Sequence, residues 1–97
     1  MYRLWTRRVG TYVVAGDMAA PLSPATKAFG ERVRTRRHEL GFSQEQLAEA
    51  AGLHWTFVGQ VERGQRNLSL KNILKLAQGL GVDAGELVRG LQTQSKL

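Results

Sequence analysis

The chain has 97 residues, with 14 Lys or Arg against 8 Asp or Glu, two His and no Cys. This length suits one small domain with an arm or a tail, and it is too short for a second domain or a large catalytic cleft. Without Cys the chain forms neither disulfides nor a Cys-based zinc site, which fits a reducing cytoplasm. The net charge of +6 predicts attraction to polyanions, with nucleic acid first and an anionic membrane surface second. We expect no membrane-spanning helix, since no stretch reaches the roughly 20 apolar residues required.

The first 22 residues differ in composition from the rest, and we expect them to form an N-terminal extension outside the core. A flexible or single-strand extension is the interpretation that we favour. Two alternatives stay open: a short secretory signal whose basic region is Arg3, Arg7 and Arg8, and a basic arm that enters a DNA minor groove. Met18 is also a candidate start of translation, in which case residues 1–17 are not part of the native chain.

From Ser23 onward, residues that begin and end helices recur along the chain. Ser or Asp precedes four segments as an N-cap, and Gly follows four as a left-handed stop. The predicted helices cover residues 24–40, 44–51, 55–63, 70–80 and 84–91. Since no segment has a credible strand pattern, the predicted fold class is all-α, a compact five-helix bundle. The domain spans residues 23–92, and residues 93–97 are expected to fray.

Apolar residues at a spacing near 3.6 give each predicted helix one inward face. We expect these faces to form the core: Ala25, Phe29, Val33, Leu40, Leu47, Ala48, Ala51, Val58, Val61, Leu70, Ile73, Leu74, Ala77, Leu80, Leu87, Val88 and Leu91.

The predicted helices 44–51 and 55–63 are short and are joined by a tight turn at Gly52. These are the dimensions of a helix-turn-helix. Ala48 and Ala51 precede the turn, and side chains this small let the two helices cross closely.

The outer face of helix 55–63 is the candidate functional surface. Val58 and Val61 face inward, which leaves polar residues on the opposite side. That side carries no acidic residue and consists of Thr56, Gly59, Gln60 and Arg63, with Trp55 at its leading edge.

Residues 43–82 read SQEQLAEAAGLHWTFVGQVERGQRNLSLKNILKLAQGLGV. This segment resembles the Cro/repressor-type, or XRE-like, helix-turn-helix DNA-binding domains of bacteria and their phages. Within this family, GLHWTFVGQVERGQRN followed by LSLKNI is most similar to the controller proteins of restriction-modification systems, which are small dimeric transcription regulators. The resemblance covers residues 26–91. Two residues depart from the pattern: Trp55 replaces a basic or small polar residue, which leaves the operator sequence open, and Leu68 replaces a proline in the loop.

The resemblance implies a lambda-repressor-like fold and a sequence-specific transcription regulator that binds double-stranded DNA. One module of this size buries too little DNA surface for tight specific binding. We therefore expect a homodimer that places two such helices about one helical turn apart on a palindromic operator. Controller proteins associate through their C-terminal helices, and the dimer surface should come from apolar residues that the core leaves over. The candidates are Leu76, which lies off the inward face of its helix, Val88 and Leu91.

Base contacts are expected on the outer face of helix 55–63. The Gln60 amide can pair bidentately with adenine, and the Thr56 methyl group can pack on the thymine methyl group. For Trp55, a base contact and a place beside the core remain equally open. Gly59 permits a close backbone approach, either to DNA or to the preceding helix.

Phosphate contacts are expected at one helix start and around one turn. Gln44 begins its helix, where unpaired backbone N–H groups and the positive end of the dipole suit an anion. Polar and basic side chains also surround the turn at Gly64. Arg32, Arg34 and Arg36 make helix 24–40 basic, either as a phosphate-facing flank or as a solvated face. The candidate phosphate contacts are Gln44, Arg34, Arg63, Arg66 and Asn67.

Arg37 is expected to have a structural role. It lies one turn after Val33, at the edge of the apolar face, so it is not a free surface charge. In the family that the chain resembles, an Arg at this position pairs with a Glu near the end of the second helix of the motif. The corresponding residue here is Glu62, and we expect a partly buried ion pair that orients the two helices.

A catalytic function lacks the necessary residues. His38 and His54 have no partner at metal-binding or catalytic-triad spacing, and no Gly-rich phosphate loop is found. We therefore expect no enzyme activity, no metal and no cofactor. The main alternative function is an antitoxin-type regulator whose residues 1–22 bind a partner protein. Membrane binding is not expected, because no outward apolar residues accompany the Arg residues of helix 24–40.

Overall fold

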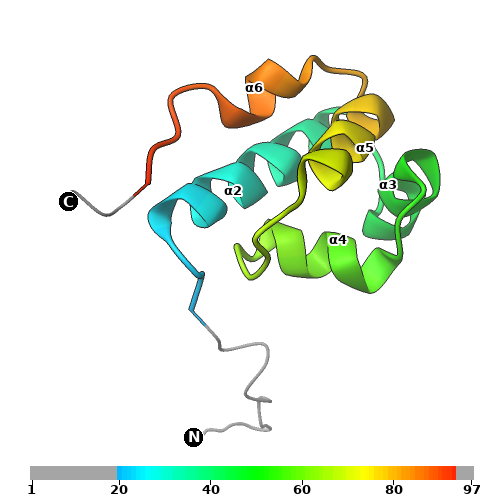
Figure 1. The fold of residues 1–97 in the computed structure, drawn as a ribbon. Coiled ribbons are helices and arrows are strands. Elements are labelled where there is room, and N and C mark those ends of the chain that lie inside the picture. Colours follow the sequence, from blue (N-terminus) through cyan, green and yellow to red (C-terminus); the bar gives the residue numbers. More distant parts are fainter. Residues whose placement is uncertain (1–19, 94–97) are drawn as a thin grey trace, which may run out of the picture.

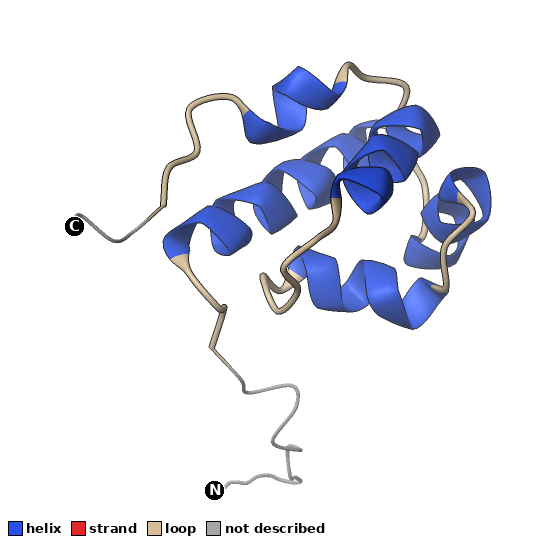
Figure 2. Ribbon diagram, in the orientation of Figure 1, coloured by secondary structure: helices blue, strands red, loops and turns tan. Residues whose placement is uncertain are grey.

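The structure, a computed structural model, describes residues 20–93 (Figure 1). Within this range the chain is helical and contains no strand (Figure 2). The all-α prediction is therefore confirmed for the described residues. The helices are α2 (Pro24–Glu39), α3 (Gln44–Ala51), α4 (Trp55–Glu62), α5 (Leu70–Leu80) and α6 (Ala84–Val88).

The long helix α2 is the element around which the domain is built (Figure 1). It packs against α4, α5 and α6, while α3 packs against α4 and α5. Consequently α3 and α4 lie together on one side of α2, and α6 lies on another. In the described part of the chain, no helix is long and apolar enough to cross a membrane.

Local sequence signals set the helix ends. Ser23 accepts a hydrogen bond from the Thr26 backbone, and the Thr26 side chain accepts one in return, which gives α2 a capping box. Ser43 and Gln46 form the predicted box at the start of α3. Gly52 follows α3 with a φ of 70°, in the left-handed conformation that glycine adopts without strain.

The last helix is shorter than predicted. Its N-cap is Asp83, as expected, but α6 ends at Val88 instead of residue 91. Arg32 of α2 donates to the backbone oxygens of Leu87 (3.2 Å) and Arg89 (2.8 Å). Because this side chain binds two of the carbonyl groups at the helix end, it stabilises the end of α6 at this position.

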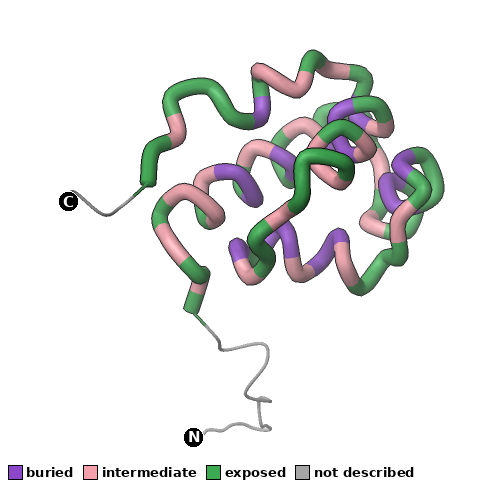
Figure 3. Tube along the Cα trace, viewed as in Figure 1, coloured by how far each residue is buried: buried purple, intermediate pink, exposed green. Residues whose placement is uncertain are grey.

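The core contains the predicted apolar residues of α3 and α4 and part of those of α2. Figure 3 shows that each of these helices contains buried positions. The fully buried large side chains come from four helices: Val33, Leu47, Val58, Val61, Leu76 and Leu80.

Four of the predicted core residues are exposed, and the prediction is wrong for them: Leu40, Leu70, Leu74 and Val88. Leu70 and Leu74 are 71% and 51% exposed, because α5 turns Leu76, Ala77 and Leu80 inward instead. Leu40 is 37% exposed, since α2 ends before it.

A glycine that the sequence analysis did not single out allows α2 and α4 to cross. A Cβ atom on Gly30 would lie 2.8 Å from the backbone oxygen of Glu62, closer than such atoms approach in proteins. Only a residue without a side chain lets the two backbones come this close. Gly30 therefore sets the distance between α2 and the helix that carries the candidate functional surface.

Candidate nucleic-acid interface

Helices α3 and α4 form a helix-turn-helix. The turn consists of residues 52–54, and the Leu53 N–H donates to the Ala48 backbone oxygen at 2.9 Å. Leu53 itself is partly buried and packs against the core. The side chain anchors the turn, so the angle between α3 and α4 is fixed by packing on the rest of the domain.

His54 begins α4 as its N-cap. Its Nδ1 accepts a hydrogen bond from the Thr56 backbone N–H (3.2 Å) and lies 2.7 Å from the Thr56 hydroxyl oxygen, within hydrogen-bond distance. The imidazole also stacks on the Trp55 indole, with ring centres 6.0 Å apart. This cap is not predictable from the residue type, because His is not among the residues that commonly cap helices.

Trp55 and Thr56 lie at the exposed start of α4. The Trp55 side chain is 49% exposed and does not belong to the core. The two interpretations of Trp55, a base contact and a place beside the core, therefore both stay predictions, since a half-exposed indole is compatible with either. Both residues are accessible to a ligand that approaches the N-terminal end of α4.

Gly59 does not lie on the outer face of α4, and its assignment as a base contact is wrong. It is buried, and a Cβ atom there would lie 3.5 Å from Gln44 Oε1 and 3.3 Å from Arg63 Nη1. The glycine thus makes room for the Gln44 side chain of α3. This agrees with the other possibility, a close approach between the two helices of the motif.

Gln60 and Arg66 meet at the C-terminal end of the outer face. The Arg66 Nη1 donates to Gln60 Oε1 at 3.1 Å. Arg63 and Asn67, from the same turn, are exposed, and the Arg63 Nε donates to Gln65 Oε1 at 3.2 Å. Three of the predicted phosphate-contacting residues thus gather beside the exposed end of α4.

Glu62 is the centre of a buried polar cluster, and the expected Arg37–Glu62 pair is present. Arg37 Nε lies 2.6 Å from Glu62 Oε2, and Arg37 Nη2 lies 2.9 Å from Oε1. Gln44 Nε2 and Arg34 Nε also donate to Oε1, at 3.1 Å and 3.4 Å. Two predicted phosphate contacts, Gln44 and Arg34, are therefore held in place by Glu62.

The cluster changes the acidity of Glu62, whose side chain has no exposed surface. Burial by itself would raise the pKa of this carboxyl group. The hydrogen bonds from Arg37 and Gln44, the charge of Arg37 and the hydrogen bond from Arg34 outweigh burial, so the pKa is lowered from its ordinary value. Glu62 is an anion at neutral pH and keeps these donors oriented.

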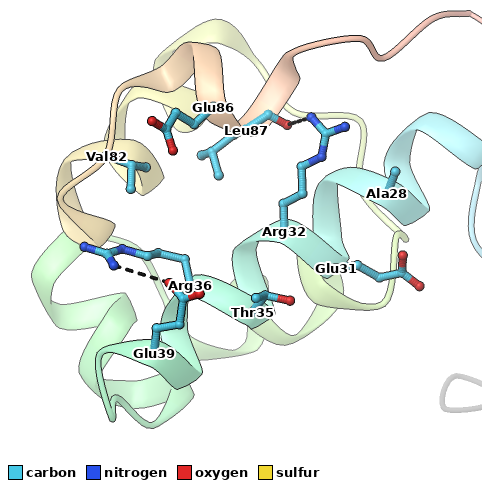
Figure 4. A pocket seen from close by; sticks show the side chains of 9 residues that line it. All are labelled: Ala28, Glu31, Arg32, Thr35, Arg36, Glu39, Val82, Glu86 and Leu87. Atoms are coloured by element: carbon cyan, nitrogen blue, oxygen red, sulfur yellow. Dashed lines mark hydrogen bonds and ion pairs between the residues drawn. The ribbon is translucent and has the colours of Figure 1, made fainter.

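Two arginines of α2 point away from this cluster, into a hollow of about 320 Å³ between α2 and α6 (Figure 4). Arg32 holds the end of α6, as described above, and Arg36 donates to the Leu80 backbone oxygen at 3.0 Å. Arg36 also pairs with Glu39 at 3.3 Å. Positive side chains at helix C-termini are favourable because they meet the negative end of the dipole. These two arginines therefore form neither of the expected surfaces, a phosphate-facing flank or a solvated face. Both bind backbone oxygens at helix ends instead.

The three candidate dimer residues differ in how far they are buried. Leu76 is fully buried, so it is not left over from the core, and its assignment to the dimer surface is wrong. Val88 is 39% exposed, and Leu91 is partly buried against the core.

Within residues 20–93, no group of three metal-ligating side chains is found, and His38 is exposed on α2.

The expectations for residues 1–22 concern a segment of which only residues 20–22 are described. The Leu22 N–H donates to the Gly64 backbone oxygen at 2.8 Å, so the chain already contacts the turn after α4 before Ser23.

A helix-turn-helix with an exposed second helix and a basic turn defines the class of DNA-binding regulators. The chain belongs to the helix-turn-helix family HTH_3, whose family model matches residues 33–87. The resemblance to the Cro/repressor type is thus confirmed, and the chain is a DNA-binding transcriptional regulator by family.

Relatives of this chain include control proteins from two bacteria. It is 42% identical over 66 residues to the control protein C.SmaI of Serratia marcescens, covering 66% of this chain and 79% of that protein. It is 44% identical over 61 residues to the control protein C.BamHI of Bacillus amyloliquefaciens, covering 62% and 75%. The crystal structure of the restriction-modification controller protein C.AhdI from Aeromonas hydrophila matches with a TM-score of 0.63 and 53% sequence identity, covering 64% of this chain and 94% of that one.

Proposed function

We propose that this chain is a homodimeric, sequence-specific regulator that binds a palindromic operator and controls a restriction-modification system. The observation that carries the proposal is the exposed outer face of α4, presented by a helix-turn-helix in a chain that is 42% identical to a control protein over 66 residues. Such a regulator acts on DNA in the cytoplasm, and the net charge of +6 favours binding to that polyanion.

In this proposal, α4 enters the major groove, which is wide enough to admit a helix. Trp55, Thr56 and Gln60 face the base edges. The phosphate contacts come from residues on both sides of α4: Gln44, Arg34, Arg63, Arg66 and Asn67. Glu62 supports the arrangement, because it holds Gln44 and Arg34 beside the helix.

The dimer is supported by apolar side chains that the core leaves exposed. Leu70 and Leu74 are one turn apart on α5, and Val88 lies on α6, which packs against α5. Exposure of several neighbouring apolar side chains to water is unfavourable in free energy, and a partner that covers them removes this cost. We propose that Leu70, Leu74 and Val88, with Leu91, form the contact between the two subunits.

The test is a selection of bound sites from a random pool of double-stranded DNA with the full chain. We expect an inverted repeat whose half-sites are about one helical turn apart. Sedimentation with the selected duplex should give two protein chains per duplex, and a single half-site should bind far more weakly. Enrichment of no sequence would show that the chain is not a specific regulator, and one chain per duplex would exclude the dimer.

A further inference from the structure

Arg66 lies in the turn after α4 and contacts two side chains of that helix. Its Nη1 donates to Gln60 Oε1 at 3.1 Å, and its guanidinium carbon lies 4.8 Å from the centre of the Phe57 ring. Phe57 and Gln60 are three positions apart, so they share one face of α4. The Gln65 N–H donates to the Gln60 backbone oxygen at 2.9 Å, which folds the turn back along the helix. Arg66 is thus held at two points beside Gln60.

This contact decides how the Gln60 amide is oriented. A guanidinium group has only hydrogen-bond donors, so the Gln60 atom that faces Arg66 is the oxygen. The amide nitrogen, with its two N–H donors, then points away from Arg66. The side chain of Gln60 therefore presents its donor end, while its acceptor end is engaged by a cation.

The orientation matters for base recognition in the major groove. A glutamine reads adenine by donating to N7 and accepting from the N6 amino group, which requires its oxygen. Guanine presents two acceptors, N7 and O6, and needs donors alone. Beside Gln60, Arg66 occupies the oxygen and adds a positive charge that disfavours an approaching amino group. The Gln60 amide, oriented in this way, offers its N–H donors, which match guanine.

We propose that Arg66 makes Gln60 a reader of guanine and not of adenine, and that Arg66 thereby determines the base preference at one operator position. The inference rests on the proposed function, since it requires α4 to enter the major groove. It replaces the adenine pairing that the residue type of Gln60 predicts by itself.

The test measures base preference with the full chain and its variants. Sites are selected from random double-stranded DNA with the wild type, and Gln60→Ala identifies the position at which Gln60 sets the preference. There we expect the wild type to bind a guanine site about tenfold more tightly than an adenine site, the effect of one good base-specific pair. In Arg66→Ala the Gln60 oxygen is released, and the preference should shift to adenine at that position alone.

Arg63→Ala is the matched control, because it removes the same charge from the same turn. Arg63 donates to Gln65 Oε1 (3.2 Å) and has no hydrogen bond to Gln60. This variant should bind all sites more weakly and keep the preference for guanine. If Arg66→Ala keeps that preference too, or if the wild type prefers adenine, the inference is overturned.

The same data separate the inference from the function on which it rests. Enrichment of no sequence by the wild type overturns both. An enriched inverted repeat in which no position depends on Gln60 overturns the inference and leaves the proposed function standing.

Discussion

The Arg37 guanidinium group holds both carboxylate oxygens of Glu62, with Nε 2.6 Å from Oε2 and Nη2 2.9 Å from Oε1. The two residues are 25 positions apart and join α2 to α4. Arg37 Nη1 also donates to the Phe42 backbone oxygen at 2.8 Å, which closes the turn between α2 and α3. One buried side chain thus connects α2 to α4 and to the turn that leads into α3.

Replacing Arg37 with Ala should destabilise the domain by about 3–5 kcal/mol, because it leaves the buried Glu62 carboxylate without its main partner. Arg34 also contacts Glu62, but its side chain is 50% exposed. Arg34→Ala should therefore cost less than about 1 kcal/mol. Urea unfolding of the two variants makes the comparison, and equal small losses would show that Arg37 and Glu62 do not form a structural pair.

The stability of the domain should fall in acid partly through Glu62. Its pKa is lowered in the folded state from the ordinary value of 4.5, so the unfolded chain takes up the proton first. The contribution of Glu62 is then complete above pH 4.5 and is lost as the pH falls towards the folded pKa. The free energy of unfolding, measured against pH for the wild type and Glu62→Gln, should show a difference that shrinks below pH 4.5. A difference that stays constant with pH would contradict this assignment.

Gly30→Ala should separate α2 from α4. The added methyl group would lie 2.8 Å from the Glu62 backbone oxygen, and a backbone atom cannot move aside as a side chain can. We expect a loss of about 1–3 kcal/mol, although alanine favours a helix over glycine. Gly59→Ala is the control: its nearest neighbours are the ends of the Arg63 and Gln44 side chains. Thermal unfolding should show it to be close to neutral, and a similar loss in both variants would argue against the crossing as the cause.

Helix starts are predictable from the sequence because they depend on short-range chemistry, whereas the end of α6 depends on a contact with the distant Arg32. Ser43 and Gln46 satisfy each other's backbone groups within one turn, so the start of α3 was placed at the correct residue. The Arg37–Glu62 pair was also expected, but through the resemblance to a family and not from spacing alone. In both cases the partner of each residue can be named from the sequence: Gln46 lies within one turn of Ser43, and the family pattern supplies Glu62 as the partner of Arg37.

The features that sequence reasoning missed depend on which elements pack together. In α5, two leucine patterns have helical spacing, and only contact with α3 and α6 selects the face with Leu76 and Leu80 over the face with Leu70 and Leu74. Gly30 could have been identified from the sequence, since glycine inside a helix lowers its stability and is therefore expected where another backbone packs closely.

Leu76 and Leu74 should respond to truncation in opposite ways. Leu76 is fully buried, so Leu76→Ala leaves a cavity and should destabilise the domain by about 2–5 kcal/mol. Leu74 is 51% exposed, and Leu74→Ala should change the unfolding of the isolated subunit by less than about 0.5 kcal/mol. If Leu74 lies in the dimer contact, sedimentation at a series of concentrations should show weaker association for Leu74→Ala. Unchanged association would remove Leu74 from the proposed contact.

The last prediction separates the reading of bases from the holding of phosphates. Thr56→Ser keeps the hydroxyl group that forms a hydrogen bond with His54 Nδ1 but removes the methyl group proposed to pack on a thymine. It should weaken operator binding by about 1 kcal/mol and leave binding to random DNA unchanged. Arg63→Ala removes a charge without base specificity, so it should weaken both and lower the slope of log K against log salt by about 1.

Paired titrations of operator and random DNA at several salt concentrations make this comparison for each variant. The two variants serve as controls for each other, since one changes the ratio of the two affinities and the other changes the salt slope. Thr56 stands at the exposed start of α4, and Arg63 stands at its end. If Thr56→Ser preserves the affinity ratio while Arg63→Ala lowers it, the bases are read from the turn after α4, and the proposed orientation of α4 in the groove is wrong.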